Sequence, residues 1–111
     1  MAKKILGQSN PSATTVTTLY TVPASRETTV SSISVANLTT SSATFRIILQ
    51  AAAEVSGTIL NKQYFAYDIT VGLSDTTVIT VGITLTAGDV IKVYGSTASL
   101  AFQAFGDEVV L

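Results

Sequence analysis

The chain has 111 residues, a net charge of −1 and a pI near 5.0, with 47% hydrophobic and only 12% charged residues. This length fits one domain with one core, and the small net charge excludes the basic surface through which proteins bind nucleic acid. There is no Cys and no His, which removes disulfides, thiol chemistry, the commonest general base and the best zinc ligands.

The first thirteen residues, MAKKILGQSNPSA, lack any alternation of polar and apolar residues. Two lysines are not followed by an apolar run, so we expect neither a secretion signal nor a membrane anchor, and a protein kept in the cytosol until assembly. We predict an extended N-terminal arm over residues 1–13 that docks on another chain or subunit through Lys3, Lys4, Ile5 and Leu6. The alternative is that this segment packs back along its own sandwich.

Residues 14–111 are predicted to form a single β-sandwich domain, because a period of two recurs along them. The 18 Thr and 12 Ser of the chain favour exposed strand positions. The segment VTTLYTV runs into Pro23, which ends a strand or places it at a sheet edge. In TVSSISVANL the alternation slips between Val30 and Ile33, which is typical of a β-bulge.

Three later segments, ATFRIILQA, YFAYDITV and TTVITVGITLT, alternate more regularly and are predicted strands. The core-facing residues they predict are Phe45, Ile47 and Leu49 in the first, Phe65, Tyr67, Ile69 and Val71 in the second, and Ile79, Val81, Ile83 and Leu85 in the third. TAGD then supplies a turn with Gly88 at positive φ, and VIKVYG and SLAFQAFG follow as strands. ILQAAAEVSG is a strand end and loop that allows one helical turn.

About eight short strands without a long helix predict an all-β fold of two antiparallel sheets packed face to face, in jelly-roll or Greek-key order. An immunoglobulin-like sandwich is the nearest competitor. Its usual Trp and Cys core signature is missing here, which does not exclude it.

Six carboxylates are the candidates for chemistry: Glu54, Asp68, Asp75, Asp89, Asp107 and Glu108. A pair of them would suit a glycosidase, and Asp107 with Glu108 or Asp75 with Asp89 would suit calcium. Most stand beside turns, however, where Asp bonds to nearby backbone, and no calcium-loop spacing is present. We therefore predict no catalytic residue, no metal site and no cofactor.

The aromatic residues are assigned mostly to the core by their position in the alternation. Tyr64 falls on the polar face of its strand and is the best exposed candidate for contact with a partner.

Four segments carry a resemblance: ATTVTTLYTVPAS, VSSISVANLTTSSATFRI, YFAYDITV and ITLTAGDVIKVYGSTASLAFQAFGDE. Together, from Ala13 to Glu108, they resemble a group of small all-β virion proteins of tailed bacteriophages. In that group a T-x-L-Y-T-V-P-A opening and a late A-G-D-x-I-x-V-Y run recur. The resemblance implies a structural subunit of the capsid decoration or the tail and neck accessory type, and it brings no catalytic residues.

We therefore expect a capsid decoration (cement) protein that bridges major capsid protein subunits and is a homo-oligomer, either a trimer or a dimer. Its location would be the virion, assembled in the host bacterial cytoplasm, with neither nucleic acid nor membrane as a partner. The alternatives are a tail, neck or baseplate/fibre component, and a carbohydrate-binding module that uses loop tips and Tyr64. An enzyme ranks last.

Overall fold

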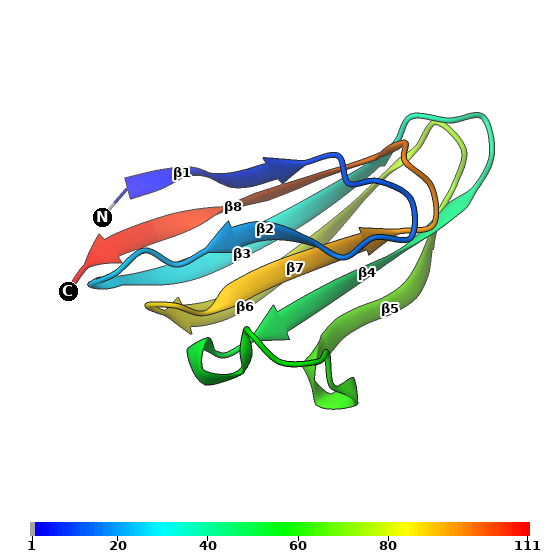
Figure 1. Cartoon of the computed structure of the whole chain (residues 1–111). Coiled ribbons are helices and arrows are strands. Elements are labelled where there is room, and N and C mark those ends of the chain that lie inside the picture. Colours follow the sequence, from blue (N-terminus) through cyan, green and yellow to red (C-terminus); the bar gives the residue numbers. More distant parts are fainter. Residues whose placement is uncertain (1) are drawn as a thin grey trace.

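The computed structural model describes residues 2–111 and shows an all-β protein of two four-stranded antiparallel sheets packed face to face (Figure 1). The predicted two-sheet sandwich of about eight strands is confirmed. The strands are β1 (Ala2–Ser9), β2 (Thr17–Thr21), β3 (Arg26–Asn37), β4 (Ala43–Gln50), β5 (Tyr64–Val71), β6 (Thr76–Thr86), β7 (Val90–Gly95) and β8 (Leu100–Val110). Two 3-10 turns, η1 (Ala52–Glu54) and η2 (Asn61–Gln63), lie between β4 and β5. The first falls in ILQAAAEVSG, where the sequence allowed one helical turn, and the second lies beyond it.

The first sheet has the order β1-β8-β3-β6 and the second sheet the order β2-β7-β4-β5. The pairing is nested, because β1 pairs with β8, β2 with β7, β3 with β6 and β4 with β5. Nested pairing across two sheets is the jelly-roll arrangement, which is one of the two orders left open by the sequence. The second sheet lies in front in Figure 1.

The core fills the space between the sheets. Phe45 of β4 and Phe102 of β8 are fully buried and meet edge to face, with ring centroids 6.1 Å apart and planes at 74°. An edge-to-face aromatic pair contributes more to stability than the burial of its apolar area alone. Strand β6 follows the predicted alternation, with Leu85 buried and its other inward residues half-buried at the sheet edge.

Two local predictions are also confirmed. The register of β3 shifts between Val30 and Ser32 against both of its neighbours, so that Val30 and Ile33 both reach the core. The hydroxyl of the intervening Ser31 donates a hydrogen bond to the carbonyl oxygen of Phe105 at 3.1 Å. Gly88 has a φ of 88° in the turn between β6 and β7.

Strand β5 departs from the prediction. Phe65, Tyr67 and Ile69 were expected in the core, but they are 41%, 55% and 42% exposed. The register of β5 against β4 shifts twice, and Asp68 takes a φ of 51° inside the strand. Each extra residue interrupts the period of two. The small Ala66 packs on the core instead, and Val71 is buried as predicted.

The N-terminal segment also differs from its prediction. Residues 1–13 were expected as an arm on another chain, but Ala2–Ser9 pair with β8 of the same sandwich as the edge strand β1. This outcome is the alternative in which the segment packs back along its own chain. Gly7 lets β1 approach β2, because a Cβ there would clash with the carbonyl oxygen of Leu19. Met1 lies outside the described residues.

The segment 51–63 folds over the outer face of the second sheet. Ile48 and Gln50 are both buried. Ile48 does not belong to the core cluster between the two sheets. Gln50 Nε2 donates to Gln63 Oε1 at 3.0 Å, and Lys92 Nζ donates to the carbonyl oxygen of Val55 at 3.2 Å. The predicted polar face of β4 is therefore partly covered, and its exposed part lies around Arg46.

Candidate functional site

Arg46 lies between two tyrosine rings on the outer face of the second sheet. Its Cζ atom is 4.2 Å from the ring centroid of Tyr67 and 4.4 Å from that of Tyr94. The three residues come from adjacent strands, since Tyr94 of β7 pairs directly with Arg46 of β4 and Tyr67 belongs to β5. A guanidinium at this distance from aromatic faces is held by cation–π attraction and stacking.

Asp68 fixes the orientation of the guanidinium. Arg46 Nε donates to Asp68 Oδ1 at 2.7 Å, and Nη2 lies 3.4 Å from Oδ2. The hydrogen bond with Asp68 raises the pKa of Arg46 above its ordinary value, so the guanidinium stays charged at any physiological pH. The positive φ of Asp68 places its carboxylate beside Arg46, so the irregularity of β5 builds this cluster.

A shallow hollow of about 340 Å³ adjoins this cluster and is lined by Asn61, Tyr64 and Tyr67. Tyr64 and Tyr67 meet edge to face with centroids 4.9 Å apart and planes at 88°, so they present ring surfaces in different directions. Asn61, from η2, adds amide donors and an acceptor. We call Asn61, Tyr64, Tyr67, Arg46 and Asp68 the tyrosine hollow. Ring faces beside directional polar groups suit a ligand with an apolar face and a polar rim, such as a sugar ring.

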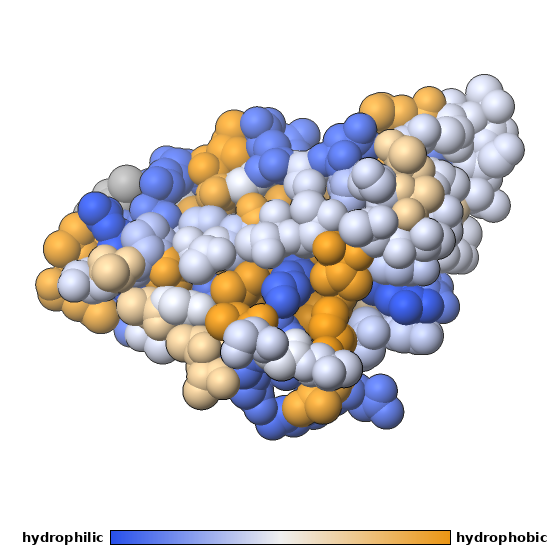
Figure 2. Space-filling model, viewed as in Figure 1, coloured by the Kyte–Doolittle hydropathy of each residue, from blue (hydrophilic) through white to orange (hydrophobic). Residues whose placement is uncertain are grey.

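The surroundings of the hollow are mixed in polarity. Figure 2 shows the second sheet from the same side as Figure 1, with hydrophobic and hydrophilic residues interspersed over it. Tyr64, predicted as an exposed contact, is half-buried at the hollow. Its neighbour Tyr67 is more exposed, although the alternation placed it in the core.

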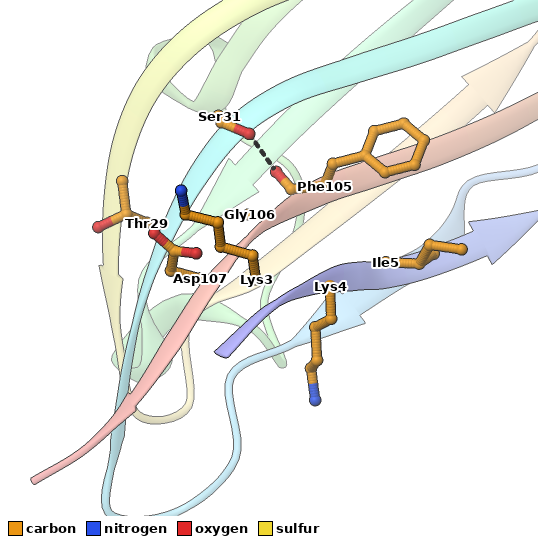
Figure 3. A pocket seen from close by; sticks show the side chains of 8 residues that line it. All are labelled: Lys3, Lys4, Ile5, Thr29, Ser31, Phe105, Gly106 and Asp107. Carbon is orange, nitrogen blue, oxygen red and sulfur yellow. Dashed lines mark hydrogen bonds between the residues drawn. The ribbon is translucent and has the colours of Figure 1, made fainter. Parts of the chain in front are cut away.

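A second hollow, of about 560 Å³, lies on the outer face of the first sheet (Figure 3). Lys3 and Ile5 of β1 stand opposite Asp107 and Phe105 of β8 on this face. Ile5 is 52% exposed. The residues lining this hollow are Lys3, Lys4, Ile5, Thr29, Ser31, Phe105, Gly106 and Asp107.

Lys4 and Leu6 serve the fold more than an exposed surface. In Figure 3 the Lys4 side chain points away from that of Lys3, and its Nζ lies 2.8 Å from Glu108 Oε1. Leu6 packs against the core. Tyr64 is on the outer face of the other sheet, so the structure does not bring the five predicted contact residues together.

Glu108 is the centre of a buried polar network that the sequence did not reveal. Its Oε2 accepts a hydrogen bond from Tyr20 Oη, which also lies 2.7 Å from Thr28 Oγ1. The hydrogen bond from Lys4, followed by that from Tyr20, lowers the pKa of Glu108. Burial, followed by the hydrogen bond to Glu108, raises the pKa of Tyr20 to about 12. The Glu108 carboxylate and the Tyr20 hydroxyl are therefore both engaged in contacts that hold the fold together.

The proposed calcium pairs are not supported by the geometry. Asp107 and Glu108 are consecutive in β8 and point to opposite faces of the first sheet. Asp75 Oδ1 accepts the N–H of Thr76, and Asp89 accepts the N–H groups of Ala52 and Thr86, which are the turn roles predicted for them. Within residues 2–111 no group of three or more acidic side chains is arranged to hold a metal ion.

Comparisons with models of known protein families, with characterised proteins and with solved structures gave no match for this chain. In the described part of the chain, none of the helical segments has the length and apolar character needed to cross a membrane.

Proposed function

We propose that the protein is a structural subunit of a bacteriophage virion, and specifically a capsid decoration (cement) protein that binds and stabilises the head shell. In this role the protein catalyses no reaction and acts by covering part of the surface of the head shell. The proposal rests on the resemblance of residues 13–108 to small phage virion proteins and on the character of one broad face.

That face is the outer surface of the first sheet, and it is the observation that carries the proposal. Among the described residues no helix or loop segment covers it as 51–63 covers the second sheet. Along β6 and the Ser31–Ala36 part of β3 its outward residues carry no charge, and Glu27, opposite Thr86, ends this stretch. They are Ser31, Ser32, Ser34, Ala36, Thr76, Val78, Thr80, Gly82, Thr84 and Thr86.

A surface of this kind suits contact with a large partner. The centres of protein interfaces are depleted in charged residues, and stable contacts bury about 1,600 Å² in total. Hydroxyl groups keep such a face hydrated in the free subunit and become hydrogen-bond partners in the complex. Jelly rolls occur in viral capsid proteins, which supports the proposal by analogy of fold alone.

A particle-binding assay tests the proposal. Purified protein is mixed with phage heads that lack it, and the bound fraction is measured by sedimentation and gel densitometry. Ser34→Lys, in the middle of the charge-free face, is expected to abolish binding. The control Thr70→Lys, on the exposed outer face of β5, is expected to bind like the parent chain. Equal binding by both variants contradicts a role for this face.

The tyrosine hollow favours a second candidate, in which the protein is a tail or fibre component that binds carbohydrate. Two non-parallel rings with an adjacent amide and a held guanidinium supply both stacking and directional hydrogen bonds. On a glycan array this candidate predicts selective binding that Tyr67→Ala removes. Phe105→Ala, an aromatic truncation on the other sheet, is the control. A flat response of the parent chain to all glycans rejects it.

A further inference from the structure

Strand β6 is a long free sheet edge. It pairs with β3 on one side and is the last strand of the first sheet. From the described residues, no hydrogen bond outside the β3 ladder reaches the backbone of 77–85. The strand TTVITVGITLT contains no charged residue and no Pro. Charge, Pro and covering segments are the usual devices that protect an edge from another chain.

The unpaired backbone groups of this edge can be assigned. The N–H of Asn37 donates to the carbonyl oxygen of Asp75 at 2.8 Å, which continues the β3–β6 ladder and turns odd-numbered residues toward β3. The ends agree, because the N–H groups of Thr76 and Thr86 are taken by aspartate side chains. The residues whose N–H and C=O groups face outward are therefore Val78, Thr80, Gly82 and Thr84.

The sequence of β6 is close to symmetric about Val81. Reading outward from this residue, two of the five mirrored pairs are identical and a third joins two β-branched residues. The mirrored pairs are Thr80 and Gly82, Ile79 and Ile83, Val78 and Thr84, Thr77 and Leu85, and Thr76 and Thr86.

We propose that β6 is a self-association edge, where a second copy of this chain adds its own β6 antiparallel about a two-fold axis at Val81. Residues that face each other then lie on the same side of the sheet, as an antiparallel ladder requires. Thr80 faces Gly82 of the second copy, and Val78 faces Thr84, as hydrogen-bonded pairs that use the outward groups. The two four-stranded first sheets become one continuous sheet.

This register also covers apolar surface. Ile79, Val81 and Ile83 are packed against the core but half-buried at the open edge. In the paired edge Val81 meets Val81, and Ile79 meets Ile83, at the closer non-hydrogen-bonded positions. No like charges are opposed, because the strand has none. A Cβ built on Gly82 meets nothing within 4 Å, so the facing Thr80 has room.

The register makes a test with matched variants possible. Because positions 80 and 82 face each other across the axis, Thr80→Lys/Gly82→Lys opposes like charges, whereas Thr80→Lys/Gly82→Glu opposes unlike charges. By sedimentation equilibrium we expect a dimer for the parent chain, a monomer for the Lys/Lys variant and a dimer for the Lys/Glu variant. Circular dichroism checks that each is folded.

A parent chain that stays monomeric over the whole concentration range overturns the proposal, and so does equal behaviour of the two double variants in either state. If a double variant does not fold, Thr80→Pro replaces it. This substitution removes one outward N–H at a sheet edge, where Pro is tolerated, and a dimer that survives it also overturns the proposal. The test uses purified protein, so its outcome is independent of the proposed virion role.

Discussion

Lys4, in the first strand, and Glu108, in the last, form an ion pair with 2.8 Å between Nζ and Oε1. The carboxylate is almost fully buried, whereas about half of the lysine side chain is exposed. Tyr20 of the second sheet donates to the same carboxylate. The pair therefore fastens the edge strand β1 to β8 and links both sheets at this end of the sandwich.

Replacing Glu108 tests this link through the pH dependence of stability. The folded pKa of Glu108 lies below its ordinary value of 4.5, so its contribution is present above that pH and is lost as pH falls through the folded pKa. Glu108→Gln is expected to lower the free energy of unfolding by about 1–3 kcal/mol near neutral pH. The gap to the parent chain should shrink in urea unfolding experiments below pH 4.5. Glu27→Gln, at an exposed position of β3, is the control and should show no such gap.

The raised pKa of Tyr20 predicts that the protein loses stability at alkaline pH. Its folded pKa of about 12 exceeds the ordinary value of 10.0, so the neutral hydroxyl stabilises the fold below pH 10 and this contribution disappears as pH rises toward 12. Tyr20→Phe is expected to cost about 1–3 kcal/mol near neutral pH, because Glu108 loses a donor. The difference between parent and variant should narrow above pH 10. A difference that stays constant, or one reproduced by Tyr94→Phe, would contradict the assignment.

Replacing Gly106 or Gly82 with Ala should affect the stability of the protein very differently. A Cβ on Gly106 of β8 would overlap the carbonyl oxygen of Thr29 in the neighbouring strand, whereas a Cβ on Gly82 meets open space. Gly106→Ala is expected to destabilise the protein by about 3 kcal/mol or more, because the backbones must separate. Gly82→Ala should stay within about 0.5 kcal/mol of the parent chain. Thermal unfolding of both variants measures this, and similar midpoints would show that β3 and β8 do not approach so closely.

Two substitutions of Asp68 distinguish the effect of backbone strain on stability from the effect of losing the charge. The φ of 51° at Asp68 is adopted more readily by Asn than by a β-branched residue, for which this conformation is strained. Asp68→Asn is expected to cost less than about 1 kcal/mol, since the ion pair with Arg46 is partly exposed. Asp68→Val should add about 1–2 kcal/mol of strain. If the two variants unfold at the same urea concentration, the positive φ does not govern the shape of β5.

The regular parts of the sandwich were predictable from local pattern. The alternation in β6, the slip at Val30 and Ile33, and the positive φ at Gly88 each leave a signal within a few residues. The two-sheet architecture follows, because alternating strands must cover one apolar face each.

The remaining features depend on partners that are distant in sequence. Strand β1 shows no alternation, because Lys4 faces inward to meet Glu108, which lies near the other end of the chain. Strand β5 loses its period of two at Asp68, and no sequence rule predicts that an Asp inside a strand adopts positive φ. The Arg46 cluster needs β7, β4 and β5 as neighbours, and the sequence left that order open.

Counting copies of the protein in purified phage particles by quantitative mass spectrometry tests the central claim most directly. The account predicts many copies per particle, in a fixed ratio to the major capsid protein. Absence from the particles would contradict it. A few copies that co-purify with tails would instead support the tail or fibre alternative and contradict a role on the head shell.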